Sequence, residues 1–80
     1  MPRKLNNWSY QHVTDFLKDH GFVFFEELKG RRVWTKLENG EPVRFVELSI
    51  KSKKYVAKTM KSIIRQSGIV VEDWIEWAGK

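Results

Sequence analysis

The stretch Lys53–Ile69, with the sequence KKYVAKTMKSIIRQSGI, carries an apolar stripe and a basic stripe at helical spacing. At about 100° per residue, one face collects the apolar side chains of Val56, Met60, Ile63 and Ile64. The far side collects the basic side chains of Lys54, Lys58, Lys61 and Arg65. Gly68 follows the last periodic residue and can adopt the left-handed conformation that ends a helix. The stretch therefore predicts a helix that packs one face on a core and presents a positively charged face outward, either to solvent or to phosphates.

The composition of the chain narrows the class of protein. The chain has 80 residues, no cysteine and a formal net charge of +5. This length predicts one small domain spanning residues 1–80, and the lack of cysteine fits a cytoplasmic protein that needs no disulfides. No apolar run is long enough to span a membrane, and the start MPRKLNNW lacks the apolar core of a signal peptide. The positive charge favours an anionic partner such as nucleic acid or an acidic protein.

A first helix is predicted from Ser9, as its N-cap, to about His20. Trp8 and Val13 flank the cap at the positions of a hydrophobic staple, and Gly21 supplies the stop. The buried face of this helix is expected to hold Tyr10, Val13, Phe16 and Leu17.

Three short runs rich in aromatic and β-branched residues follow, at Phe22–Leu28, Arg31–Glu38 and Glu41–Ile50. Lys29-Gly30 separates the first two runs. Asn39-Gly40 separates the second two and is a strong signal for a type I′ hairpin, because both turn residues need positive φ. The order predicts an α+β fold, an α-β-β-β-α two-layer domain in which a three-stranded antiparallel meander carries both helices on one face.

Treating both turns as two-residue loops fixes a register in which Leu28 pairs with Arg31 and Glu38 with Glu41. One sheet face then carries the larger apolar set, and we assign this face to the helices. The set is Phe22, Phe24, Leu28, Val33, Leu37, Val46, Leu48 and Ile50. The open face carries two cross-strand rows, with Phe25, Trp34 and Phe45 in one and Glu27, Arg32 and Glu47 in the other. In the second row, opposite charges would lie beside each other across the strands.

An aromatic row on an open sheet face has three interpretations. It can stack unpaired bases, form a protein interface, or be covered by the chain's own extension, residues 70–80, folded as a short helix. We favour the last two interpretations, because the neighbouring carboxylates of Glu27 and Glu47 would repel phosphates. The domain would then have a core at about residues 8–69 and a C-terminal extension at residues 70–80.

Three segments of the sequence resemble one protein family. They are Gly21-Phe22-Val23, Lys29-Gly30 and the run from Lys58 to Ile69, KTMKSIIRQSGI. Over roughly Tyr10 to Ile69 the chain resembles the HicA-type toxins, which are small ribonucleases (mRNA interferases) of bacterial and phage toxin–antitoxin pairs. The resemblance implies a double-stranded-RNA-binding-like fold with an α-β-β-β-α order, RNA as the ligand and a HicB-like antitoxin as a protein partner.

A different residue occupies the position at which that family carries its catalytic histidine. In the family, the histidine stands two residues after the glycine that opens the second strand; Gly30 matches the glycine, and Arg32 stands at the histidine position. An arginine stays protonated and cannot shuttle the 2′-hydroxyl proton, although it can hold a phosphate. The sequence shows no metal-ligand spacing, cysteine nucleophile or phosphate loop. The catalytic residue is therefore unknown, and no metal or cofactor is expected.

Three functional hypotheses follow from these observations. The first is a HicA-like RNA-binding protein with lost or altered cleavage, and the second is an active ribonuclease in which another residue performs the acid–base chemistry. The third is a protein-interaction module that kept the fold, in which Phe25, Trp34 and Phe45, or the C-terminal tail, contact a protein partner such as a cognate antitoxin. In each case the chain is expected to be a monomer or a weak homodimer. The candidate RNA-binding residues are Lys29, Arg31, Arg32, Lys54, Lys58, Lys61 and Arg65.

Overall fold

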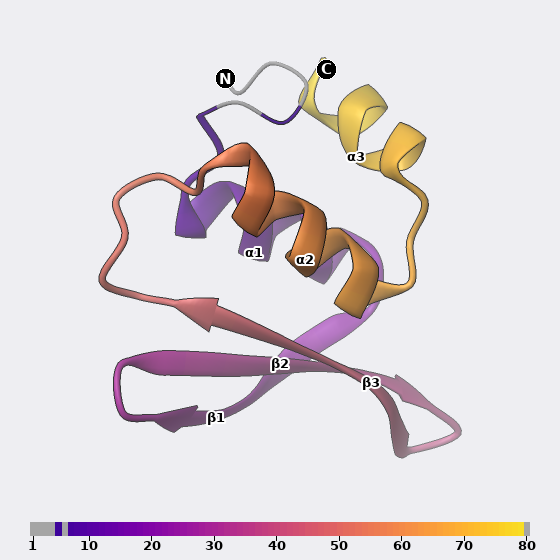
Figure 1. The fold of residues 1–80 in the computed structure, drawn as a ribbon. Coiled ribbons are helices and arrows are strands. Elements are labelled where there is room, and N and C mark those ends of the chain that lie inside the picture. Colours follow the sequence, from indigo (N-terminus) through magenta and orange to yellow (C-terminus); the bar gives the residue numbers. More distant parts are fainter. Residues whose placement is uncertain (1–4, 6, 80) are drawn as a thin grey trace.

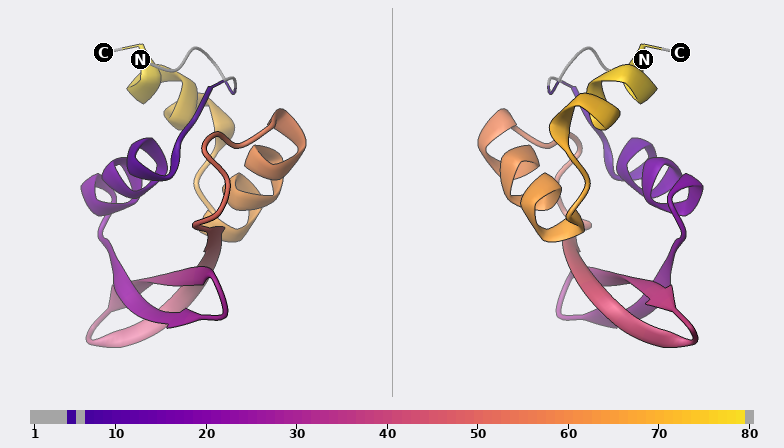
Figure 2. Two further views of the ribbon diagram at one scale, coloured as in Figure 1. Left: turned by 90° about the vertical axis from the view of Figure 1, so that its left-hand side faces the viewer. Right: turned by 90° about the vertical axis from the view of Figure 1, so that its right-hand side faces the viewer.

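Two helices cover one face of a three-stranded antiparallel sheet, and a third helix lies on the far side of these helices (Figure 1, Figure 2). The computed structural model describes Leu5 and residues 7–79. Its elements, in chain order, are α1 (Tyr10–Asp19), β1 (Phe22–Leu28), β2 (Arg31–Glu38), β3 (Glu41–Ser49), α2 (Ala57–Ser67) and α3 (Val71–Ala78). The sheet order is β1-β2-β3. The predicted α+β fold with its α-β-β-β-α order is therefore confirmed, and α3 follows it.

Local signals in the sequence build α1 as predicted. The Ser9 Oγ accepts a hydrogen bond from the His12 amide (3.2 Å), and the Ser9 amide donates to His12 Nδ1 (3.2 Å). These two bonds satisfy amides that the first turn of a helix leaves without partners. Trp8 and Val13, the predicted staple pair, are both fully buried. Gly21 follows the helix with φ +87°, a conformation that suits glycine and ends α1.

The basic helix α2 is shorter than predicted. It begins at Ala57, and Val56, predicted on the core face, is 66% exposed at the N-cap position. The cause is Tyr55, whose amide donates to the Trp8 carbonyl (2.7 Å) in an isolated antiparallel bridge. Gly68 ends the helix at φ +73°, as predicted. The other predicted core-face residues of this helix are buried: Met60, Ile63 and Ile64.

Tyr55 makes the free energy of unfolding depend on pH in the alkaline range. The ring is buried, and its hydroxyl donates to the Ser49 carbonyl (2.6 Å). Burial raises the pKa of Tyr55 from 10.0 to about 12, because the ionised form would lose its hydration. A raised folded-state pKa contributes stability that is fully present below pH 10 and is lost as the pH rises to about 12.

The free energy of unfolding, measured by urea titration at several pH values, should therefore fall more steeply between pH 10 and about pH 12 in the wild-type protein than in Tyr55→Phe. Lysines also titrate in this range, but they do so equally in both proteins. Equal slopes for the two proteins would contradict the burial of this hydroxyl.

The sheet forms the predicted turns but departs from the predicted register. Both hairpin turns pair the predicted residues, and both positions of each turn have positive φ. Beyond the turns, one β-bulge interrupts each pair of strands and leaves Phe25 without a partner on β1 and Val43 without a partner on β3. Each bulge shifts the pairing by one residue, which moves the following side chains to the opposite face relative to their neighbours.

Because of the bulge in β3, the side chains of β2 lie on the opposite sheet faces from those predicted. Trp34 pairs with Val46 instead of Phe45, so its indole faces the helices and is buried. Two features favour this shift: it places the larger apolar side chain, the indole, in the core cluster under the helices, while Val33 is still buried on the opposite face, and Pro42, next to the bulge, has no N–H for the ladder. The prediction that Trp34 belongs to an aromatic row on the open face is therefore wrong.

The two bulges also correct the assignment of the other strand residues. Phe22, Phe24, Val46 and Leu48 face the helices as predicted, but Leu28, Val33 and Leu37 lie on the open face. Ile50, predicted in the third strand, follows the end of β3. On the open face, the rings of Phe25 and Phe45 lie 5.4 Å apart and edge to face.

The C-terminal extension forms α3 but leaves the open sheet face uncovered (Figure 2). Trp74 of α3 is fully buried; its ring stacks on Phe16, with centroids 3.7 Å apart, and meets Trp8 edge-on at 5.4 Å. Trp77 Nε1 donates to Asp19 Oδ2 (2.8 Å). The prediction that residues 70–80 cover the open face is therefore wrong, because α1 and the segment before it offer α3 an aromatic surface on the side away from the sheet.

Candidate nucleic-acid interface

A groove opens on the helix side of the sheet, between α1 and the strands β1 and β2. It encloses about 390 Å³. Helix α1 contributes Tyr10, Gln11, Thr14 and Lys18, and the strands contribute Phe24, Glu27, Arg32 and Trp34. We call this set the α1 groove. It combines three aromatic rings with two cations and one carboxylate. The groove forms because the β3 bulge places the side chains of Arg32 and Trp34 on the helix side of the sheet.

The Tyr10 hydroxyl organises the α1 groove. It accepts hydrogen bonds from Arg32 Nη1 (3.4 Å) and Trp34 Nε1 (3.3 Å). The guanidinium carbon of Arg32 lies 5.4 Å from the centroid of the Tyr10 ring, within the range of a cation–π interaction. Arg32 Nε also donates to Glu27 Oε1 (2.9 Å). The hydrogen bond to Tyr10, followed by the one to Glu27, raises the pKa of Arg32, so this side chain stays a cation.

Arg32 lies beside one carboxylate rather than the predicted two. Because of the β3 bulge it pairs with Leu48, and the Glu47 carboxylate instead lies 3.7 Å from Arg31 Nη1. The predicted charge row through Glu47 is therefore wrong. Two of the five N–H groups of Arg32 bond within the groove. The Arg32 side chain is still 39% exposed, which leaves it accessible to an anion.

Phe24 and Lys18 add an exposed ring and a second cation to the groove. The Phe24 side chain is 51% exposed, and its ring meets the buried Trp34 ring edge-on, with centroids 6.0 Å apart. Lys18 Nζ lies 5.6 Å from the Trp34 ring centroid. Exposed aromatic surface beside cations is the combination with which proteins stack bases and hold the phosphates next to them.

A second positive region lies at the end of the sheet where the β1–β2 turn meets the loop that follows β3 (Figure 1). The Ile50 amide donates to the Gly30 carbonyl (3.1 Å) and ties the loop to the turn. Lys51 lies directly against this turn, since a β-carbon added to Gly30 would lie 3.0 Å from Lys51 Cε. We call this region the basic corner. The exposed basic residues of its two segments are Lys29 and Arg31 at the turn, and Lys51, Lys53 and Lys54 along the loop, with Lys54 at the end of the loop beside Tyr55.

The structure divides the predicted RNA-binding residues among three places. Lys29, Arg31 and Lys54 lie in the basic corner, and Arg32 lies in the α1 groove. Lys58, Lys61 and Arg65 are exposed on α2. Lys54 was expected on the same helical stripe as these three, but it precedes α2 and lies in the loop. The Tyr55 bridge explains this difference, because it keeps the backbone before α2 out of the helix.

Among the cations and exposed rings of these two regions, sequence reasoning missed Lys18, Phe24, Lys51 and Lys53. It also gave no site role to Tyr10, whose hydroxyl bonds to Arg32 and Trp34. The run Lys51-Ser52-Lys53-Lys54 carried a signal for the corner, but only its last residue fits the helical period. Of the predicted interface residues, Phe25 and Phe45 remain together on the open face, and Trp34 lies in the α1 groove.

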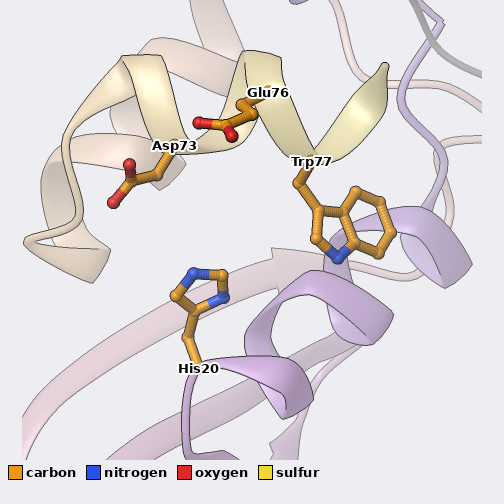
Figure 3. Close-up of a pocket in the computed structure, with 4 residues that line it drawn as sticks. All are labelled: His20, Asp73, Glu76 and Trp77. Atoms are coloured by element: carbon orange, nitrogen blue, oxygen red, sulfur yellow. The ribbon is translucent and has the colours of Figure 1, made fainter. Parts of the chain in front are cut away.

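A separate cavity of about 250 Å³ lies between the end of α1 and α3, and it is lined by His20, Asp73, Glu76 and Trp77 (Figure 3). His20 stacks on the Phe16 ring, with centroids 4.1 Å apart, and its Nδ1 donates to the Phe16 carbonyl (2.9 Å). The carboxylates of Asp73 and Glu76 would repel a phosphate at this cavity. This cavity therefore differs in charge from the α1 groove and the basic corner, where cations outnumber carboxylates.

No family model and no curated protein matches this sequence. Within Leu5 and residues 7–79, no helix has the length and apolar character to cross a membrane, and no three histidine, cysteine or acidic side chains cluster as metal ligands. Function is therefore inferred from the chemistry of the α1 groove and the basic corner, together with the resemblance in sequence.

Proposed function

We propose that this chain is a HicA-like RNA-binding protein that contacts RNA phosphates through the basic corner. The corner supports the proposal, because the β1–β2 turn and the loop that follows β3 both carry exposed basic residues and touch each other where Lys51 lies against Gly30. The hydrogen bond from Ile50 to Gly30 holds the two segments together. The formal net charge of +5 favours an anionic partner. The α-β-β-β-α order agrees with the fold that the resemblance implies.

Helix α2 extends the positive surface beyond the corner. Lys58 lies in the first turn of α2, shortly after Lys54 of the corner, and Lys61 and Arg65 are also exposed. A polyanion lying on the corner can therefore contact further cations along this helix. The resemblance adds a HicB-like antitoxin as the proposed protein partner.

The proposal covers RNA binding and assigns no cleavage step. Arg32 occupies the position of the family's histidine, and its contacts with Tyr10 and Glu27 raise its pKa further. A side chain that stays protonated cannot accept a proton from a 2′-hydroxyl. It can hold a phosphate through its remaining N–H groups, so we assign Arg32 to phosphate binding.

Salt-dependent titration tests the proposed function. Fluorescence anisotropy with a short labelled RNA should give a binding constant whose logarithm falls linearly with the logarithm of salt concentration between about 50 and 200 mM. Each phosphate contact on a single strand contributes about −0.7 to this slope, so three or more contacts give a slope steeper than about −2. A slope near zero, or no binding at the lowest salt, would contradict the proposal.

A further inference from the structure

We infer that the α1 groove binds one unpaired nucleotide of the RNA, with its base stacked on Phe24 and its phosphate held by Lys18 and Arg32. The inference rests on the RNA-binding function proposed above. It adds the substrate class, which is RNA with unstacked bases rather than a continuous duplex.

In the groove, the base would stack on the ring of Phe24, which is packed on one side and exposed on the other. Phe24 is 51% exposed although it lies within a strand, and its inner side contacts the ring of the buried Trp34. Trp34 is itself fixed, because its Nε1 donates to the Tyr10 hydroxyl (3.3 Å). Phe24 therefore offers a flat apolar surface whose orientation is set by packing before any ligand arrives, which lowers the entropic cost of stacking a base on it.

The phosphate would meet two cations, each of which lies over a different aromatic ring of the groove: Arg32 over Tyr10 and Lys18 over Trp34. Arg32 is oriented by Tyr10 on one side and by Glu27 on the other, and it keeps an exposed edge. Lys18 approaches Trp34 from α1, with Nζ 5.6 Å from the ring centroid. The single carboxylate of the groove, Glu27, is ion-paired with Arg32 (2.9 Å). One negative charge against two positive charges leaves the groove attractive to a phosphate.

The size and shape of the groove favour an unpaired nucleotide. A volume of about 390 Å³ lies within the usual range of small-ligand sites. The bases of an A-form duplex also keep their faces stacked on each other, so a ring can stack only on a base that has left the helix.

Titrations of Phe24 variants with a short single-stranded RNA, and with the duplex of the same sequence, test the inference. Loss of one base stack should weaken single-strand binding of Phe24→Ala about 5- to 100-fold. Its salt slope and its duplex affinity should stay unchanged, because a stack releases no counterions. Phe24→Tyr keeps the ring and should bind like the wild-type protein. Phe24→Leu keeps apolar bulk without the ring and should bind as weakly as the alanine variant.

Phe25→Ala is the matched control, because Phe25 is the next residue of β1, is 49% exposed and lies on the opposite face. It should bind single-stranded RNA like the wild-type protein, and thermal unfolding checks that each variant is folded. Wild-type affinity of Phe24→Ala, equal losses on single strand and duplex, or a larger loss in Phe25→Ala would each overturn the inference. If the wild-type protein shows a steep salt slope in that case, the proposed function stands without the groove. If it binds no RNA, both fail.

Discussion

Replacing Trp74 by alanine is expected to lower the free energy of unfolding by about 3–5 kcal/mol, the usual cost of removing a large buried aromatic side chain. Trp74 is fully buried, stacks on Phe16 at 3.7 Å and meets Trp8 edge-on at 5.4 Å. The substitution would leave a cavity between α1 and α3 that these rings cannot refill. Urea unfolding followed by far-UV circular dichroism measures the change.

Ile75→Ala is the control on the same helix, because Ile75 is 38% exposed and its truncation should cost about 1 kcal/mol or less. Trp74→Phe should also cost less than the alanine variant. It keeps an aromatic ring and removes an indole N–H that is buried without a hydrogen-bond partner among the described residues. A stability of Trp74→Ala equal to that of the wild-type protein would show that α3 does not pack on α1 in solution.

The first helix was predictable because its signals are local. The cap at Ser9, the staple of Trp8 with Val13 and the stop at Gly21 each involve residues a few positions apart. The cap and the stop form as expected, and both staple residues are buried. The two hairpin turns are local in the same sense, so the residue pairs next to them were also correct. Signals of this kind need no knowledge of the rest of the fold.

The faces of β2 were not predictable from the turns. A two-residue loop fixes the first pairs of a hairpin, but a bulge farther along depends on which side chain the core accepts. Trp34 and Val33 compete for the helix-facing side, and the turn sequence carries no information about the outcome. The bulge beside Pro42 places Trp34 on the helix-facing side. Arg32, two residues earlier on the same strand, therefore also faces the α1 groove.

Helix α3 packs on a surface that forms only in the folded protein and cannot be recognised from the sequence. The alternation of Trp74 and Trp77 with acidic residues predicts an amphipathic helix, and the helix forms. Its docking site is made by Phe16 and Trp8, which come together only after α1 has folded. The same limit applies to the basic corner, where Lys51 meets the β1–β2 turn through a contact between distant segments.

Reversing two charges of the basic corner is expected to weaken RNA binding about 10- to 100-fold, because each lysine lost removes a charge-assisted contact worth about 1 kcal/mol or more. The variant is Lys51→Glu/Lys53→Glu, and both side chains are exposed, so the fold should be retained. Loss of two phosphate contacts on a single strand should also make the salt slope shallower by about 1.4.

The matched control is Lys36→Glu/Arg44→Glu, which makes the same change in net charge on a cross-strand pair away from the basic corner. The most direct measurement is the ratio of the dissociation constants of these two double variants, for one single-stranded RNA at one salt concentration. A corner variant at least about tenfold weaker than the control, with the shallower salt slope, is the result expected if the corner contacts phosphates. Equal losses in the two variants, or a larger loss in the control, would contradict an RNA site at the basic corner.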